Sequence, residues 1–299
     1  MKSKILRGTA LEGQVRIFIA DTTELVEKAK EIHQTSPVAI AALGRVLTAT
    51  SILGVMLKGE NHKITTRIQG KGPLGTIIAT SNASGNVKGY VTNPQVMVDS
   101  SIPGKLNVGG AVGKDGDITI IKDLGLKNPY IGKYPLVSGE IGEDLAAYFM
   151  YSEQQPSAVG LGVTIEKDYT IKSAGGFVLQ MLPETDENIA FILEERIKEV
   201  GSISKLIENS RNEKEIMHQL LEGLDPKVLE EYEVDYICDC NRSRFEKALI
   251  SLGQQEIKSL ITENQGAEIQ CHFCNKKYHF NEKDLESLAM EAANPNSKP

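Results

Sequence analysis

The sequence predicts an α+β protein with three parts. Over residues 1–183, β-type segments separated by Gly, Asn and Pro outnumber a few helices, which is typical of a largely antiparallel sheet with packed helices. Residues 184–235 form an acidic helical linker, and residues 236–299 contain all four cysteines. A length of 299 residues exceeds that of most single domains, so more than one folded unit is expected.

The chain begins with a predicted strand pair and a helix. Apolar and polar residues alternate over residues 5–21, and Gly13 interrupts them, which predicts a strand pair or one bent strand. A capping-type Thr and apolar residues at 3.6-type spacing predict a helix over residues 22–36. The N-terminus has no apolar h-region and no small-residue cleavage site, so we expect no signal peptide and a cytoplasmic protein.

The most apolar stretch, residues 37–58, predicts a buried helix. Pro37 lies at a helix-start position and apolar residues occupy most faces, so a sheet should pack against this helix. Its longest charge-free run, residues 46–57, has 12 residues, whereas a membrane-spanning helix needs about 20. We therefore expect no association with a membrane.

The rest of the first domain is mostly β-type. A helix is predicted over residues 139–156, where Pro156 stops it. Residues 157–183 predict two strands joined by a short turn near Lys167 and Asp168. Further strands are predicted over residues 62–70, 75–81, 85–93 and 116–123.

The linker, residues 184–235, differs from its surroundings in charge. It has 15 acidic and 6 basic residues, a local net charge of −9, against −7 for the whole chain. Its pattern is helical with an interruption at Gly201 and Ser202, and its apolar stripes are modest. Short helices are marginal in water, so we expect this linker to be metastable and to need a surface on which to dock.

Two glycine-rich stretches are not nucleotide-binding loops. "QGKGPLG" has the G-x-G-x-x-G spacing, but Pro73 lies inside it and a strand follows, whereas the dinucleotide motif must open a helix. In "GGAVGKDGD", Lys114 is followed by Asp115 where a Ser or Thr should coordinate magnesium, and no helix is predicted to follow. No histidine or carboxylate pair forms a recognisable catalytic arrangement, so we expect no enzyme.

The four cysteines form two tight pairs, C-x-C and C-x-x-C, with 30 residues between them: Cys238, Cys240, Cys271 and Cys274. In a reducing compartment, this clustering suggests a metal site or a redox device rather than a permanent disulfide framework. Four thiolates suit tetrahedral zinc, so we predict one zinc ion in a small C-terminal zinc-binding domain. The simplest role of the zinc ion is structural: it would stabilise the fold, because roughly 60 residues rarely have enough core to fold alone.

Two other interpretations of the cysteine pairs are less favoured. His272 or His279 could replace a cysteine, but four tightly spaced cysteines favour an all-sulfur site. A nucleic-acid zinc ribbon would need basic and aromatic surface, whereas residues 236–299 carry 9 acidic and 8 basic side chains. We therefore expect no nucleic-acid partner.

The C-x-C spacing adds redox chemistry. Each sulfur in a zinc site is held as a thiolate, which is the form that attacks peroxide or hypochlorite. Once one sulfur is a sulfenic acid, a neighbouring thiol can form a disulfide with it, and a disulfide sulfur is a poor zinc ligand. Structural zinc contributes on the order of 10 kcal/mol to the folding of small modules, so its loss should unfold this one. The spacing permits such a switch without requiring it.

The cysteine pairs and several N-terminal stretches resemble the redox-regulated 33 kDa heat-shock chaperone family, also called the 33 kDa chaperonins. The resemblance covers nearly the whole chain in the same order, and all four ligand positions match. The supporting stretches are "LTATSILGVMLK" at 47–58, "QGKGP" at 69–73, "YFMYSEQQP" at 148–156 and "AGGFVLQMLP" at 174–183.

This resemblance implies a fold, a resting state and an activity. Residues 1–183 would form a core that dimerises, with the linker docked on it. In the reduced, zinc-bound state such proteins are inactive as chaperones. Oxidation would form the disulfides Cys238–Cys240 and Cys271–Cys274, release zinc, unfold the module and loosen the linker. Apolar surface would then hold unfolding client proteins without ATP.

Two other classes of function compete with this redox-activated holdase. A constitutive zinc-ribbon adaptor would bind protein or nucleic acid and would lose that binding on oxidation. A thiol–disulfide exchange enzyme is disfavoured because the C-x-x-C pair does not lie at a helix start in a thioredoxin-like βαβ pattern.

Overall fold

The computed structural model describes residues 2–293 except 101, 103, 184 and 211. Its contacts divide the chain into two units, with the boundary between Ile237 and Cys238. By its contacts, the acidic linker belongs to the first unit. The tail 294–299, which the sequence predicts to be disordered, lies outside the described residues.

The first sheet of the first unit has five antiparallel strands in the order β10-β1-β2-β9-β8. The predicted strand pair at the N-terminus is confirmed as β1 and β2, and the two strands predicted over residues 157–183 are β8 and β9. The strands are β1 (Lys4–Ala10), β2 (Val15–Asp21), β8 (Ser157–Ile165), β9 (Ile171–Met181) and β10 (Lys227–Glu233).

The second sheet is also antiparallel, in the order β5-β4-β3-β6-β7. The four strands predicted over residues 62–123 are confirmed. A short helix, α3 (Val108–Val112), and the edge strand β7 were not predicted, because α3 is glycine-rich and β7 is mostly exposed. The strands are β3 (Lys63–Gln69), β4 (Thr76–Asn82), β5 (Val87–Val91), β6 (Asp117–Asp123) and β7 (Tyr130–Pro135).

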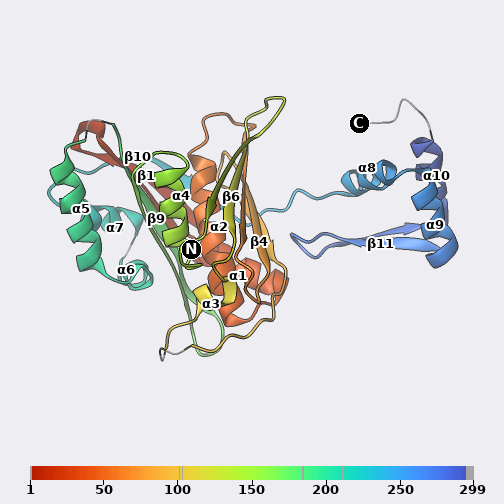
Figure 1. Cartoon of the computed structure of the whole chain (residues 1–299), viewed down its shortest axis with the longest axis horizontal. Helices are drawn as coiled ribbons and strands as arrows, with labels where there is room; N and C mark the ends of the chain where they lie inside the picture. Colours follow the sequence, from red (N-terminus) through yellow and green to blue (C-terminus); the bar gives the residue numbers. More distant parts are fainter. Residues whose placement is uncertain (1, 101, 103, 184, 211, 294–299) are drawn as a thin grey trace. The chain divides into compact units, whose positions relative to one another are not determined.

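Helix α2 (Pro37–Val55) contacts strands of both sheets, as the apolar stretch predicted (Figure 1). It is long and apolar enough to cross a membrane, but 94% of its most apolar window is buried inside the protein. It is therefore a core helix. Helix α1 (Thr23–His33) precedes it, and the predicted helix near residue 150 is α4 (Gly142–Tyr151).

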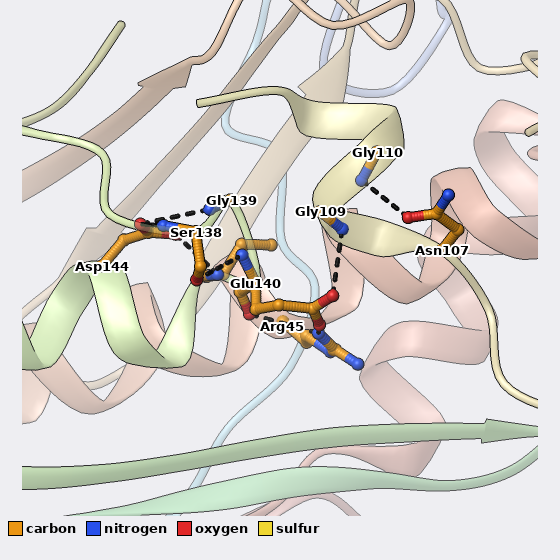
Figure 2. A network of polar contacts seen from close by, with 9 residues as sticks. Arg45, Asn107, Gly109, Gly110, Ser138, Gly139, Glu140 and Asp144 are labelled. Atoms are coloured by element: carbon orange, nitrogen blue, oxygen red, sulfur yellow. Dashed lines mark hydrogen bonds and ion pairs between the residues drawn. The ribbon is translucent and has the colours of Figure 1, made fainter. Parts of the chain in front are cut away.

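The buried Asp144 carboxylate organises the start of α4 (Figure 2). It accepts hydrogen bonds from four backbone N–H groups at 2.7–3.2 Å, namely those of Val137, Ser138, Gly139 and Ile141. As the N3 residue of α4, Asp144 satisfies the N–H of the N-cap residue Ile141, and it also satisfies three N–H groups of the preceding loop.

Most of the acidic linker folds as three helices on the face of the first sheet opposite α2 (Figure 1). The helices are α5 (Glu187–Val200), α6 (Ile203–Asn209) and α7 (Glu213–Leu220). Their apolar side chains and those of β1, β2 and β9 form a separate hydrophobic cluster, which we call the linker cluster. Its buried members include Leu6, Ile17, Phe177, Met217 and Leu220. The end of the linker was expected to be helical but forms strand β10, because it pairs with β1.

The second unit is small. The sequence predicts helices over "NRSRFEKALISLG" and "QQEIKSLITEN", and these are confirmed as α8 (Arg242–Leu252) and α9 (Gln254–Asn264). The hairpin of β11 (Gly266–Gln270) and β12 (Lys277–Asn281) and the helix α10 (Glu282–Ala292) were not predicted. The buried core of this unit has seven described residues: Leu249, Ile257, Tyr278, Phe280, Leu285, Leu288 and Ala289.

Candidate metal centre

The first cysteine pair lies in the extended segment that leads into α8. Asn241 follows Cys240 directly, and its side chain caps the helix by accepting a hydrogen bond from the Arg244 N–H at 3.0 Å. This cap defines where the helix begins and leaves the C-x-C segment outside it, in the extended conformation that an N-cap residue and its predecessors favour.

The second cysteine pair lies in the tight turn of the β11–β12 hairpin. The Cys271 N–H donates to the Lys276 carbonyl at 2.9 Å, and the Cys271 carbonyl accepts from the N–H groups of Cys274 (3.3 Å) and Asn275 (2.8 Å). Asn275 adopts the left-handed conformation with φ of 58°, which Asn tolerates better than most residues. The turn therefore holds both sulfurs at the same end of the hairpin.

The four sulfur atoms converge. All four Sγ atoms lie within 4.8 Å of one another, and no disulfide joins them. Two of the separations between the pairs are 3.7 Å, from Cys238 to Cys271, and 3.4 Å, from Cys240 to Cys274. A tetrahedral zinc–thiolate centre with bonds of about 2.3 Å has S···S edges of about 3.8 Å. The donor set and its spacing therefore fit a zinc ion.

The thiols of this cluster influence one another's ionisation. Burial raises the pKa of Cys238 and of Cys274 above the ordinary thiol value. Burial acts in the same direction on Cys240, but hydrogen bonds from Tyr278 and the neighbouring cysteines outweigh it and lower the pKa of Cys240. Cys240 therefore ionises more readily than Cys238 and Cys274. A bound divalent cation would favour the thiolate at every position.

Tyr278 supports the cluster from β12. Its hydroxyl lies 3.2 Å from the Cys240 Sγ and donates a hydrogen bond to the Cys240 carbonyl at 3.1 Å. The hydrogen bond with Cys240 raises the pKa of Tyr278 to about 12. Its ring packs on Phe245 with centroids 4.7 Å apart. Sequence reasoning missed this residue, although it lies only four positions beyond Cys274.

Arg242 ties the first cysteine pair to the rest of the second unit. Its guanidinium donates to the His279 carbonyl at 2.7 Å and forms ion pairs with Glu246 (3.0 Å) and Asp284 (2.8 Å). It also lies over the Phe280 ring, 4.3 Å from the centroid. One side chain thus links the start of α8 to β12 and α10. The sequence offers no signal for this role beyond the position of Arg242 two residues after Cys240.

Neither alternative ligand is part of the cluster. Among the described residues, the candidate metal-binding group consists of the four cysteines alone. His279 faces Glu268 instead, with 3.3 Å between its Nδ1 and the carboxylate, and His272 is not a member of the group.

The first amides of the second glycine-rich stretch bond to the protein's own side chains (Figure 2). The Gly109 N–H donates to the Glu140 carboxylate at 3.2 Å, and the Gly110 N–H donates to the Asn107 side chain at 2.8 Å. A Cβ on Gly70 would lie 2.2 Å from the Gly113 carbonyl, so glycine allows the two stretches to pack together. These amides serve packing and helix capping, in agreement with the rejection of both motifs as nucleotide sites.

Comparison with known proteins places this architecture in a family. The family model described as "Hsp33 protein" matches residues 3–281 of the chain. This chain belongs to the Hsp33 family. A 33 kDa chaperonin from Alkaliphilus metalliredigens is 60% identical to it over 97% of this chain and 100% of the relative. A 33 kDa chaperonin from Clostridioides difficile is 47% identical over 97% of this chain and 100% of the relative.

A solved structure agrees with the Hsp33 fold. The crystal structure of the 33 kDa chaperonin (heat shock protein 33 homolog) from Thermotoga maritima matches with a TM-score of 0.90 at 36% identity, covering 97% of this chain and 98% of that one. The match extends over the N-terminal sheets, the linker helices and the cysteine-containing unit, so the resemblance seen in the sequence is confirmed at the level of the fold.

Proposed function

We propose that this chain, a chaperone of the Hsp33 family, is a redox-activated holdase that binds unfolding proteins without ATP. The observation that carries the proposal is the convergence of four thiols within 4.8 Å of one another in a unit whose buried core has only seven described residues. Such a unit depends on its metal for folding, so chemistry at the sulfurs controls whether it is folded.

In the resting state, Cys238, Cys240, Cys271 and Cys274 would bind one zinc ion. Bound zinc supplies a cross-link between the C-x-C segment and the β11–β12 turn and stabilises the thiolate form of each sulfur. The chain itself contributes the orientation of the two cysteine pairs. Tyr278 and Arg242 hold the first pair against the hairpin that carries the second pair.

Oxidation would proceed through two disulfides. A thiolate attacks peroxide, becomes a sulfenic acid and releases hydroxide, and the neighbouring thiolate then displaces the second oxygen as hydroxide; two protons from solvent convert both hydroxides to water. Each disulfide therefore removes two electrons from two sulfurs and converts one peroxide into two waters. The pairing Cys238–Cys240 and Cys271–Cys274 rests on the family resemblance, because the mutual proximity of the four sulfurs brings every pairing within reach.

The consequence of oxidation would be release of the linker. The segment that precedes Cys238 is anchored in the first unit: Tyr236 is buried, its hydroxyl donates to the Gly89 carbonyl at 2.7 Å, and residues 235–237 bridge to Val87. Helices α5 to α7 are short and acidic, and they depend on the linker cluster for burial of their apolar side chains. Their release would expose that face of the first sheet to a client protein.

The remaining parts of the proposal concern partners and location. We propose unfolded or partly unfolded client proteins as the partners, a homodimer formed through the core, and a cytoplasmic location, where reducing conditions keep the thiols reduced. The net charge of −7 would help to keep a client-loaded complex soluble and gives no support to nucleic-acid binding.

The test compares the reduced and oxidised protein. Light scattering of a heat-unfolded client is followed in parallel with zinc release, free-thiol count and disulfide mapping by peptide mass at increasing peroxide dose. We expect the reduced protein not to suppress aggregation, and the peroxide-treated, mildly warmed protein to suppress it once zinc is lost. Equal suppression in both states would show that there is no redox switch. Activity in the reduced state that oxidation abolishes would instead indicate a constitutive zinc-ribbon adaptor.

A further inference from the structure

The linker covers two different features of strand β1. Helix α7 lies over its face, where Leu6 and Ala10 join the linker cluster, and β10 lies along its outer edge. At Gly8 the two meet, because a Cβ there would lie 2.5 Å from the Met217 Sδ and 3.1 Å from the Lys227 carbonyl. Release of the linker would therefore expose a hydrogen-bonding edge as well as an apolar face.

The register shows which backbone groups of β1 face this edge. The Val234 N–H donates to the Ser3 carbonyl at 3.0 Å, so the backbone groups of Ser3 face the β10 side. Alternate residues of an antiparallel strand face the same side, and Ile5 and Arg7 therefore also face β10. They lie opposite Tyr232 and Glu230, respectively, in the register.

We infer that the outer edge of β1 is a client-binding surface, to which an extended segment of an unfolding polypeptide adds as an antiparallel strand in place of β10. The inference rests on the proposed function, because β10 has to leave with the linker. An exposed strand edge pairs readily with another extended chain, and main-chain hydrogen bonds then provide affinity that is largely independent of sequence. A holdase that meets many different clients needs this kind of binding.

Strand β10 shows which client chemistry fits best. Glu230 pairs with Arg7 at 3.0 Å and Glu233 with Lys2 at 2.7 Å, and both pairs are exposed. Tyr232 lies opposite Ile5 and packs against the main core. The preferred segment is therefore extended, with an acidic residue opposite Arg7 and an apolar or aromatic residue opposite Ile5. Exposed ion pairs contribute little to affinity, so the charges would select the register.

The test uses full-length protein and synthetic peptides with the sequence of residues 225–235, DPKVLEEYEVD. One peptide is N-methylated at Glu230 and Tyr232, whose N–H groups face β1. The control peptide is N-methylated at Glu231 and Glu233, whose N–H groups face away. We expect the control peptide to bind to protein in which the β1 edge is free. The peptide methylated at Glu230 and Tyr232 lacks two main-chain hydrogen bonds, so its affinity should be lower by roughly tenfold or more.

One variant exposes the edge without oxidation, and a second variant serves as its control. Tyr232→Pro removes an N–H that faces β1 and should free the edge in the reduced protein, whereas Glu231→Pro removes one that faces away and should leave β10 paired. Hydrogen exchange at the Ile5 and Arg7 amides reports whether the edge is free. We expect these amides to exchange rapidly in reduced Tyr232→Pro and to become protected when the control peptide binds.

The outcomes separate this inference from the proposed function. If reduced Tyr232→Pro binds the peptides with the expected methylation pattern but oxidised wild-type protein does not, edge pairing is correct and linker release by oxidation is wrong. If a freely exchanging edge binds both methylated peptides equally, or neither of them, edge pairing is overturned, whatever oxidation does to the linker.

Discussion

At the scale of single residues, two side chains that are not ligands hold the cysteine cluster together. Tyr278 contacts Cys240 through its hydroxyl, and Arg242 connects the start of α8 to β12 and α10. Replacing groups that orient ligands in this way commonly weakens metal binding by about 10–100-fold. The contacts of these two side chains therefore support the cluster in addition to the four sulfurs.

Replacing Tyr278 by Phe should weaken zinc binding. The variant loses the hydroxyl that lies 3.2 Å from the Cys240 Sγ but keeps the ring that packs on Phe245. We expect a loss of roughly tenfold in zinc affinity, measured by competition with a chromogenic chelator in the presence of a thiol reductant. The exposed Tyr169, replaced by Phe, is the matched control. Unchanged affinity in Tyr278→Phe would show that the hydroxyl has no supporting role.

The half-buried Glu140 should make stability pH-dependent. Burial acts to raise its pKa, but the hydrogen bond and charge of Arg45, 2.7 Å away, outweigh it and hold the pKa below the ordinary 4.5. A carboxyl whose pKa is depressed on folding stabilises the protein above about pH 4.5 and loses that effect as the pH falls through its folded value. Glu140→Gln should therefore cost about 1–2 kcal/mol of unfolding free energy at pH 7 and progressively less below about pH 4.5.

Urea unfolding of the first unit at pH 7 and below about pH 4.5 measures the stability lost in Glu140→Gln. The exposed Glu60, replaced by Gln, serves as the control and should leave the unfolding free energy unchanged. A Glu140→Gln deficit that stays constant with pH would mean that the carboxylate charge does not contribute.

At the scale of elements, the first sheet has two apolar faces with different partners. One face packs on α1 and α2 and belongs to the main core, and the other packs on α5 to α7. The first contact joins the sheet to a buried helix of 19 residues, whereas the second joins it to three helices of 14, 7 and 8 residues. If one side detaches while the sheet stays folded, we therefore expect it to be the linker side.

Leu220→Ala should make that detachment easier. Leu220 is fully buried in the linker cluster, and removing its side chain leaves a cavity that costs about 2–5 kcal/mol. We expect faster hydrogen exchange in α5 to α7 and suppression of client aggregation at a lower peroxide dose. Phe191→Ala is the matched control, because Phe191 lies on the same linker but is 67% exposed. Equal behaviour of the two variants would contradict a role for the linker cluster in activation.

At the scale of the whole molecule, the chain has one unit with a large core and one that is small. Removal of zinc from the reduced protein should therefore unfold residues 238–293 alone, because bound zinc contributes on the order of 10 kcal/mol to the folding of such modules. Hydrogen exchange after treatment with a strong chelator and a thiol reductant should show loss of protection in α8 to α10 and retained protection in α2. Protection that persists in the second unit would show that its small core is sufficient.

The sequence was most informative where the periodicity is strong. The apolar helix α2, the N-terminal hairpin and the strands β8 and β9 were predicted because their patterns have one clear interpretation. The edge strands β7 and β10 were missed because most of their side chains are exposed, so no alternation of apolar and polar residues marks them as strands. Their partners across the sheet determine their structure.

The cysteine spacing by itself determined the candidate ligands, since thiolates in tight pairs match the coordination preference of zinc regardless of the surrounding fold. Only the tertiary structure shows which residues surround the cysteines and which surfaces of the first sheet the linker covers. The contact of Tyr278 with Cys240 joins residues 38 positions apart, and the pairing of β10 with β1 joins residues 218 to 229 positions apart. Local sequence patterns do not predict such contacts, because packing of the whole chain determines them and the propensity of a single segment does not.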